Sequence, residues 1–279
     1  MTAPLVDTHL HLWDLARSPY RWITPAHGPL HTTIGPDRAA TELNRAGVPR
    51  AVLVQADDTD ADTDFMLEVA HREPWVAGVV GWVRLDDPAA AAARLDELAG
   101  EPALRGIRHL VHDDPRDDFL RLPAVRTSLR LLAGRGLAFD VPDAWPRHLA
   151  DVADLAAGLP ELTVVLDHLG KPPADPSDLP EWRRLFAAIA ARPNTVAKLS
   201  GLQHLPASSL RPVFDAALEL FGPDRLAWGS DWPMTLGGNG YPGTLAATMP
   251  LVDELTADER AALLGGTAER VYRLGEVRS

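Results

Sequence analysis

The chain has 279 residues, of which 46% are hydrophobic, a length near the upper size of one domain, so we predict a single domain over residues 1–279. The absence of cysteine excludes disulfides and thiolate metal sites, so any metal must be held by histidines and carboxylates. The formal net charge of −12, without a cluster of basic residues, argues against a nucleic-acid partner.

Short apolar or β-branched runs alternate along the chain with Ala-, Leu- and Arg-rich stretches of helical spacing. Eight strands are predicted, over residues 5–9, 50–56, 76–83, 106–111, 137–141, 162–168, 195–200 and 226–230. The predicted helices between and after them include residues 37–46, 88–99, 123–133, 146–157, 180–191, 208–220 and 257–272.

This alternation is typical of repeated βα units around a parallel sheet. A doubly wound open sheet alternates as well, but it usually has fewer units and a Gly-rich first turn, whereas eight units in roughly 250 residues is the barrel count. We therefore predict an α/β fold, a (β/α)8 TIM barrel. Residues 13–35 lack clear periodicity, and a long loop there would lie over the barrel mouth, where binding residues sit.

The first predicted strand leads into two histidines, His9 and His11, that are separated by one residue. Alternate residues of a strand point to the same side, so both imidazoles can face one centre inside the barrel mouth. Taken alone, the pair is also compatible with two satisfied polar groups at a strand end.

Two further predicted strands lead to candidate site residues. His168 ends the sixth apolar run and Asp231 follows the eighth. Barrel enzymes carry their catalytic groups at the C-terminal ends of the strands. We therefore predict that three histidines and one carboxylate converge on one site, the alternative being a chance gathering of polar groups at three strand ends.

The segments around these residues resemble the amidohydrolase superfamily. Matching segments occur in order through almost the whole chain, and they include VDTHLHLWD at residues 6–14, LDHLGKP at 166–172 and GSDWP at 229–233. Within the superfamily the resemblance is to amidohydrolase-related family 2, in the branch of sugar lactonases similar to L-fuconolactonase and L-rhamnonolactonase. It implies hydrolysis of a sugar-derived lactone, such as L-fucono- or L-rhamnonolactone, to the aldonic acid.

The resemblance also implies roles for the predicted site residues. Asp231 would take a proton from the attacking water, and His168 would take part in catalysis beside it. His9, His11, His168 and Asp231 would bind one divalent cation, for which we expect zinc. Catalysis without a metal stays open, with the histidines donating hydrogen bonds to the carbonyl under attack.

Arg108 and His109 stand at the end of the fourth predicted strand, where superfamily members with two metals carry a bridging lysine, so we expect no binuclear site. Arg108 is predicted to act in catalysis by aiming its guanidinium at the lactone carbonyl or a substrate carboxylate, the alternative being a structural salt bridge. His109, Lys198, Trp13 and Trp232 are the predicted substrate-binding residues. A structural ion pair for Lys198 and simple packing for the tryptophans stay open.

Two other functions are compatible with such a site. A related branch of the superfamily contains metal-dependent decarboxylases with a similar cluster of histidines and an aspartate. A barrel that binds a sugar acid without turnover is the other possibility, but binding alone does not require an unpaired carboxylate base such as Asp231. The matching segments favour the lactonase.

The expected partner is a small-molecule lactone. No run of about 18 uninterrupted apolar residues occurs and the N-terminus carries no basic and apolar leader, so we expect no membrane partner and a cytoplasmic location. The sequence does not indicate an oligomeric state. The remaining histidines, such as His27, His71 and His148, are predicted to lie at the surface.

Overall fold

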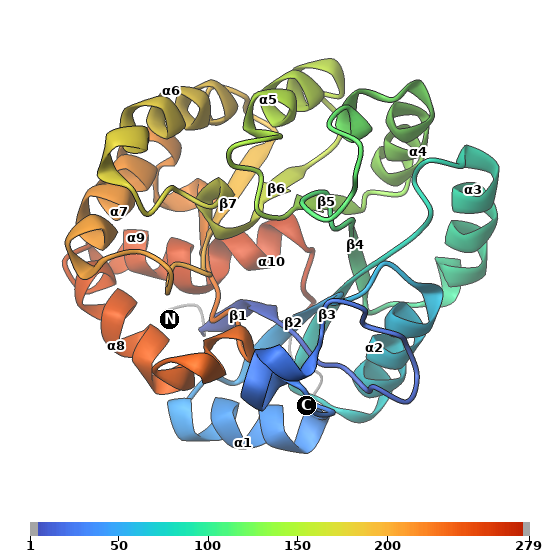
Figure 1. Cartoon of the computed structure of the whole chain (residues 1–279), viewed down its shortest axis with the longest axis horizontal. Helices are drawn as coiled ribbons and strands as arrows, with labels where there is room; N and C mark the ends of the chain where they lie inside the picture. The colour runs from blue at the N-terminus through green and yellow to red at the C-terminus, as the bar shows by residue number, and fades with distance from the viewer. Residues whose placement is uncertain (1–4, 276–279) are drawn as a thin grey trace.

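The structure, a computed structural model, describes residues 5–275. Its eight strands are parallel and form one sheet in the order β1 to β8, each strand hydrogen-bonded to the next along the chain. The strands are β1 Val6–Leu10, β2 Arg50–Val54, β3 Val76–Gly81, β4 Leu104–Arg108, β5 Ala138–Val141, β6 Val164–Leu166, β7 Thr195–Leu199 and β8 Leu226–Trp228. Figure 1 shows the strands around the centre of the molecule and most of the helices outside them.

The ring of strands closes between β8 and β1. The Asp231 amide donates a hydrogen bond to the His9 carbonyl at 2.8 Å, and the His11 amide donates to the Trp232 carbonyl at 2.8 Å. Leu10 and Trp232 form an isolated parallel bridge beside these bonds. The predicted (β/α)8 TIM barrel is thereby confirmed, and its closure places the residues after β8 directly against the end of β1.

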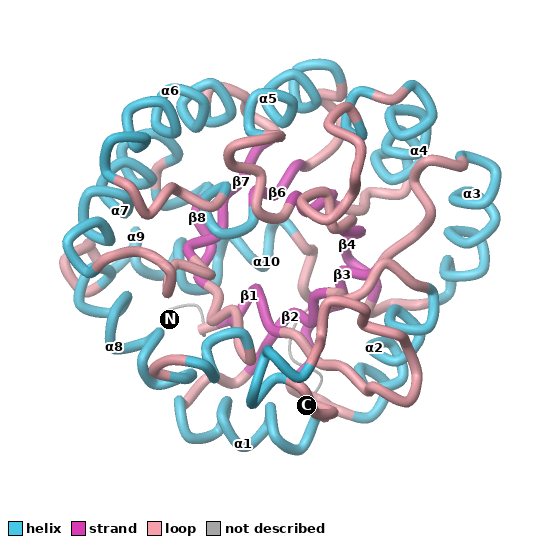
Figure 2. The backbone as a smooth tube through the Cα atoms, viewed as in Figure 1, coloured by secondary structure: helices cyan, strands magenta, loops and turns pink. Residues whose placement is uncertain are grey.

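Most of the helices cover the outside of the sheet, as Figure 2 shows by colour, whereas the last helix, over Thr267–Val271, appears at the centre of the ring of strands. They are α1 Pro36–Ala46, α2 Asp60–Arg72, α3 Pro88–Glu97, α4 Pro123–Gly134, α5 Leu149–Gly158, α6 Leu179–Ala190, α7 Ala207–Phe221, α8 Gly240–Val252, α9 Ala257–Ala261 and α10 Thr267–Val271. The helix predicted over 257–272 is interrupted by a π-helical turn over Ala262–Gly266. Two helices, α2 and α8, were not among those predicted.

Several strands are shorter than predicted because the backbone leaves the extended conformation early. β6 ends at Leu166, and the residues after it form a turn in which His168 has φ 55°. β8 ends at Trp228, and Asp231 has φ 57°. A non-glycine residue in the left-handed region cannot continue a strand. His168 and Asp231 therefore lie just beyond their strands, in the loops of the barrel mouth.

The barrel interior is filled mainly by β-branched side chains. Val52, Val54, Val80 and Val165 belong to one buried cluster, which Tyr272 joins from the residue after α10. A larger buried cluster contains the apolar side chains of the helices and the strand residues that face them. Within residues 5–275, none of the helices combines the length and apolar character needed to cross a membrane.

Candidate active site

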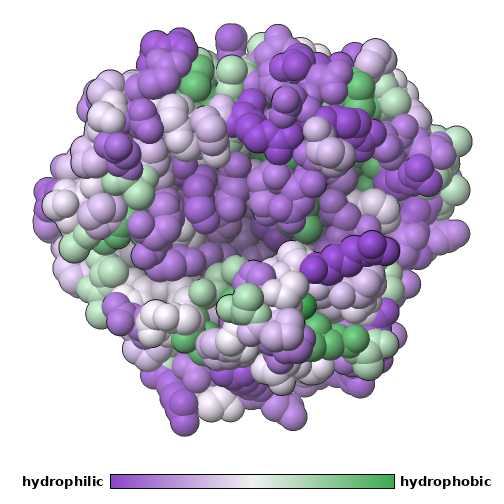
Figure 3. Space-filling model, viewed as in Figure 1, coloured by the Kyte–Doolittle hydropathy of each residue, from purple (hydrophilic) through white to green (hydrophobic). Residues whose placement is uncertain are grey.

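The mouth of the barrel contains a cavity of about 250 Å³. Figure 3 shows this face hollowed at its centre, with hydrophilic side chains around the hollow. The cavity is lined by His11, Trp22, Ala56, Arg108, Leu110, His112, Asp113, Pro142, Asp143, His168, Lys171, Gln203, Asp231 and Met234. Most of these residues end a strand or follow one, which is where barrel enzymes carry their functional groups.

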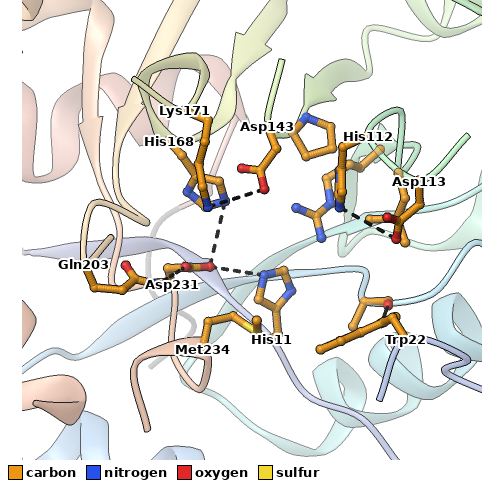
Figure 4. A pocket seen from close by; sticks show the side chains of 14 residues that line it. His11, Trp22, His112, Asp113, Asp143, His168, Lys171, Gln203, Asp231 and Met234 are labelled. Carbon is orange, nitrogen blue, oxygen red and sulfur yellow. Dashed lines mark hydrogen bonds and ion pairs between the residues drawn. The ribbon is translucent and has the colours of Figure 1, made fainter. Parts of the chain in front are cut away.

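Three imidazoles surround one oxygen of Asp231. Asp231 Oδ1 lies 3.5 Å from His11 Nε2 and 3.8 Å from both His9 Nε2 and His168 Nε2. His9 Nε2 lies 3.1 Å from His11 Nε2. Figure 4 shows Asp231 between His168 and His11 at the cavity. The four residues predicted to form one site are therefore brought together.

The outer nitrogen of each ring has a partner that sets the orientation of the imidazole. His11 Nδ1 lies 2.8 Å from the Val54 carbonyl, which can only accept, so this nitrogen carries the proton and Nε2 presents its lone pair to the cluster. His168 Nδ1 lies 2.9 Å from Ser200 Oγ. His9 Nδ1 lies 3.3 Å from Asp167 Oδ1. Such outer partners are typical of histidines that bind a metal.

The position of His168 depends on a glycine. Gly201 has φ +62°, and a Cβ atom there would come within 2.2 Å of His168 Nδ1. No other residue type fits both the left-handed backbone and the space that the imidazole occupies. The glycine after β7 therefore allows His168 to lie against the β7 loop and face Asp231.

The donor atoms fit a single zinc-sized ion. Zinc–nitrogen bonds of about 2.0–2.1 Å in a tetrahedron place the ligand atoms about 3.3 Å apart. The distance of 3.1 Å between His9 Nε2 and His11 Nε2, and the distances of 3.5–3.8 Å from the three Nε2 atoms to Asp231 Oδ1, lie near this value. Within residues 5–275, ligand atoms of His9, His168 and Asp231 all lie within 4.8 Å of one another, a group that does not include His11.

The cluster is buried, and burial and the neighbouring groups together set its charges. Desolvation lowers the pKa of His9 and of His168, which favours neutral imidazoles with a free lone pair. Burial alone would raise the pKa of Asp231, but His168 and His11 outweigh it and bring that pKa well below its usual value. The Asp231 carboxylate is therefore ionised, and its Oδ2 accepts a hydrogen bond from Gln203 Nε2 at 3.0 Å.

A buried charge network lies next to the cluster. Lys198 Nζ is 2.6 Å from Asp140 Oδ2 and 3.0 Å from Asp167 Oδ1. It also lies 3.2 Å from His9 Nδ1. Arg108 Nη1 is 3.3 Å from Asp167 Oδ2. Burial would raise the pKa of Asp167, but Lys198, His9 and Arg108 bring it well below its usual range.

For Arg108 the sequence left open a role at the ligand and a structural salt bridge, and its position in the structure is compatible with both. Its guanidinium lines the cavity and lies 3.4 Å from His9 Nε2. It also forms the ion pair with Asp167 and donates to the Gln55 carbonyl. Arg108 can therefore present a charge to a ligand while its orientation is fixed from behind.

The residues predicted to bind the substrate do not line the cavity. Lys198, Trp13 and Trp232 are fully buried and do not line the cavity. Lys198 has the structural ion pairs that its alternative assumed, and Trp13 donates through Nε1 to the Thr32 carbonyl. His109 stacks on Phe119 and also lies outside the lining. The geometry therefore gives no support to direct substrate contacts by these residues.

The prediction for one histidine was wrong. His148 was predicted at the surface but is fully buried, with Nε2 3.0 Å from the Val111 carbonyl. It directly precedes α5, whose apolar side chains pack against the barrel. His27 and His71 are exposed, as predicted.

Several residues that line the cavity had no predicted role. They include Trp22, His112, Asp143, Lys171, Gln203 and Met234. Trp22 belongs to the stretch that was predicted to lie over the mouth, which its place in the lining confirms. The others follow β4 to β8, so their position after the strands was the signal that could have identified them.

Comparisons with known proteins give relatives over almost the whole chain. A sequence profile for amidohydrolases matches residues 6–274. An L-fucono-1,5-lactonase from Burkholderia ambifaria is 36% identical over 278 residues, covering 96% of this chain and 95% of the relative. An L-fucono-1,5-lactonase from Burkholderia multivorans is 35% identical over 299 residues, covering 99% and 98%. A solved structure of an amidohydrolase from Burkholderia multivorans with bound zinc has a TM-score of 0.90 and 33% identity, covering 98% of this chain and 100% of that one.

Proposed function

Because the chain belongs to the amidohydrolase family, we propose that it hydrolyses a sugar-derived lactone to the aldonic acid. The observation that carries this proposal is the ionised Asp231 carboxylate, which lies within 3.8 Å of three imidazole nitrogens at an open cavity. The two related L-fucono-1,5-lactonases support a 1,5-lactone of a sugar acid as the substrate.

In the proposed reaction, Asp231 removes a proton from a water molecule as the water adds to the lactone carbonyl. Arg108 donates hydrogen bonds to the oxygen on which negative charge develops. The tetrahedral adduct then collapses, the bond from the carbonyl carbon to the ring oxygen breaks, and the proton held by Asp231 is returned to the ring oxygen. Water and lactone thus give one carboxylic acid and one hydroxyl group.

We infer that His9, His11, His168 and Asp231 hold one divalent ion, and we expect zinc. When bound, the ion would polarise the carbonyl and lower the pKa of the attacking water. The orientation of the imidazoles and the spacing of the donor atoms support this inference.

One zinc ion is expected to bind per chain, as measured by equilibrium dialysis followed by metal analysis. His11→Ala removes one donor and should weaken zinc binding by at least about 100-fold, because loss of an outer partner alone costs 10- to 100-fold. His71→Ala, at an exposed position on α2, is the matched control and should bind zinc normally. Zinc binding by His11→Ala that equals that of the wild type would exclude this donor set.

The proposed activity is tested by an acid-release assay over a panel of sugar γ- and δ-lactones. Purified protein is assayed with and without chelation and metal restoration. Acid release above the spontaneous rate supports the lactonase, and release that survives chelation would assign the stabilisation of the oxyanion to Arg108. No release from any lactone with metal restored would reject the proposed function.

Arg108→Met is expected to lower kcat for lactone hydrolysis by about 10²-fold or more, because it removes one donor to the developing oxyanion. Stability should fall only modestly, since Asp167 keeps Lys198 at 3.0 Å as a counter-charge. Steady-state kinetics and urea unfolding of the same preparation separate the two effects. A stability loss with normal kinetics would make Arg108 a purely structural residue.

A further inference from the structure

Part of the cavity wall has no role in the proposed hydrolysis. Asp143 follows β5, Lys171 follows the turn after β6, and His112 follows β4. All three line the cavity, and Figure 4 shows them on the opposite side from His11 and Met234. We call Asp143, Lys171 and His112 the Asp143 cluster.

The Asp143 cluster has unused hydrogen-bonding capacity. Lys171 Nζ lies 3.4 Å from Asp143 Oδ2, which is longer than the 2.7–2.9 Å typical of a charge-assisted hydrogen bond. The side chains of Lys171 and Asp143 are 33% and 27% exposed, so a ligand in the cavity can reach both partners of this long ion pair. A ligand that bonds to both groups would supply the hydrogen bonds that they do not make to each other.

The backbone of the cluster is also unusual. Asp143 has φ 40° and Lys171 has φ 62°, and neither is a glycine. Non-glycine residues in this region are held there by the surrounding structure and concentrate at functional sites. The loops after β5 and β6 therefore hold both side chains at the cavity at a conformational cost.

The protonation states suit hydroxyl groups. Burial would raise the pKa of Asp143, but His168 and Lys171 outweigh it, so the carboxylate is ionised and accepts hydrogen bonds. Burial lowers the pKa of His112, and a neutral imidazole offers one donor and one acceptor. A hydroxyl group, which donates and accepts at once, can bond to the carboxylate and to either nitrogen-bearing side chain.

The charges of the cavity favour a neutral ligand. Lys171 faces Asp143, and Arg108 faces Asp167, so each cation that lines the cavity already has a counter-charge. A ligand carboxylate would instead add negative charge near Asp143 and Asp231, which also line the cavity.

From these contacts we propose that the Asp143 cluster binds the ring hydroxyls of the substrate and makes the enzyme selective for neutral, polyhydroxylated lactones. This inference rests on the proposed function and assigns part of its specificity to named residues. A site built to bond hydroxyls discriminates against analogues that lack them, because its buried polar groups are then left unpaired.

The test compares kcat/KM for L-fucono-1,5-lactone with kcat/KM for δ-valerolactone, which has no ring hydroxyls. We expect the wild type to prefer the sugar lactone, and Asp143→Ala and Lys171→Met each to lower the ratio of the two values by about 10- to 100-fold. Asp154→Ala, which removes an exposed carboxylate paired with Arg126, is the control and should keep the wild-type ratio. A ratio unchanged within twofold in both cluster variants would overturn the proposal.

A second measurement needs no variant and applies if the substitutions prevent folding, as judged by thermal unfolding. The wild type is assayed with neutral sugar lactones and with lactones that carry an additional carboxylate. Preference for the neutral sugar lactones supports the proposal, and equal rates for all lactones, including δ-valerolactone, would overturn it while leaving the proposed hydrolysis intact. Absence of hydrolysis of every lactone would instead reject the proposed function.

Discussion

Asp231→Asn is expected to lower kcat for lactone hydrolysis by about 10²–10⁴-fold, the usual contribution of a general base. Asparagine has nearly the same shape but cannot take a proton from water at neutral pH. Its side chain can still accept the hydrogen bond that Gln203 donates to Asp231 Oδ2, so the fold and the cavity should be preserved. Steady-state kinetics of the purified variant give the loss directly.

The control for this substitution is Asp117→Asn, at an exposed carboxylate that pairs with Arg147 outside the cavity. Thermal unfolding and binding of the aldonate product should be close to wild type in Asp231→Asn, which separates loss of chemistry from loss of structure. Near-normal turnover by Asp231→Asn would remove this residue as the base.

Lys198→Met is expected to lower the free energy of unfolding by about 3–5 kcal/mol, because removing one partner of a buried ion pair leaves uncompensated charge. Lys198 is fully buried and lies 2.6 Å from Asp140 and 3.0 Å from Asp167. Methionine preserves most of the volume but supplies neither charge nor donor. Urea unfolding of variant and wild type measures the difference.

The decrease in the free energy of unfolding caused by Lys198→Met should depend on pH. Burial raises the pKa of Asp140 to about 6, and Lys198 counteracts that rise, so removing the lysine should raise this pKa further. A carboxyl group with a raised pKa in the folded state stabilises the fold at low pH and loses this contribution as pH rises through that pKa. The variant should therefore be closer to wild type at pH 5 than at pH 8.

Arg184→Met serves as the matched surface control for the stability measurement. Arg184 is exposed and pairs with Glu181 one turn away on α6, so its loss should leave the unfolding curve unchanged. A stability of Lys198→Met that equals that of wild type at both pH values would contradict the assignment of Lys198 as the central counter-charge of the network.

The barrel and the four-residue cluster were predictable because both follow from strand order. Eight apolar runs separated by helical stretches define the fold, and parallel strands bring the residues at their C-terminal ends to one mouth. The structure therefore brings together the four predicted residues, His9, His11, His168 and Asp231. The assignment of residues 1–279 to one domain stays a prediction.

The cavity wall was harder to predict because it depends on loop geometry. Asp143 and Lys171 reach the cavity through left-handed backbone conformations, for which no glycine gave a signal. Lys198 was predicted either to contact the substrate or to form a structural ion pair, and as a strand residue it lies inside the barrel, where Asp140 and Asp167 compensate its charge. Such pairing across three strands cannot be read from one strand at a time.

The most direct test of the proposed chemistry is hydrolysis of L-fucono-1,5-lactone in water enriched in oxygen-18, followed by mass spectrometry of the product. Addition of water to the carbonyl predicts enzyme-dependent formation of the aldonic acid with one labelled oxygen, located in the carboxylate. Label in the hydroxyl group formed from the ring oxygen, or release of carbon dioxide, would contradict the account.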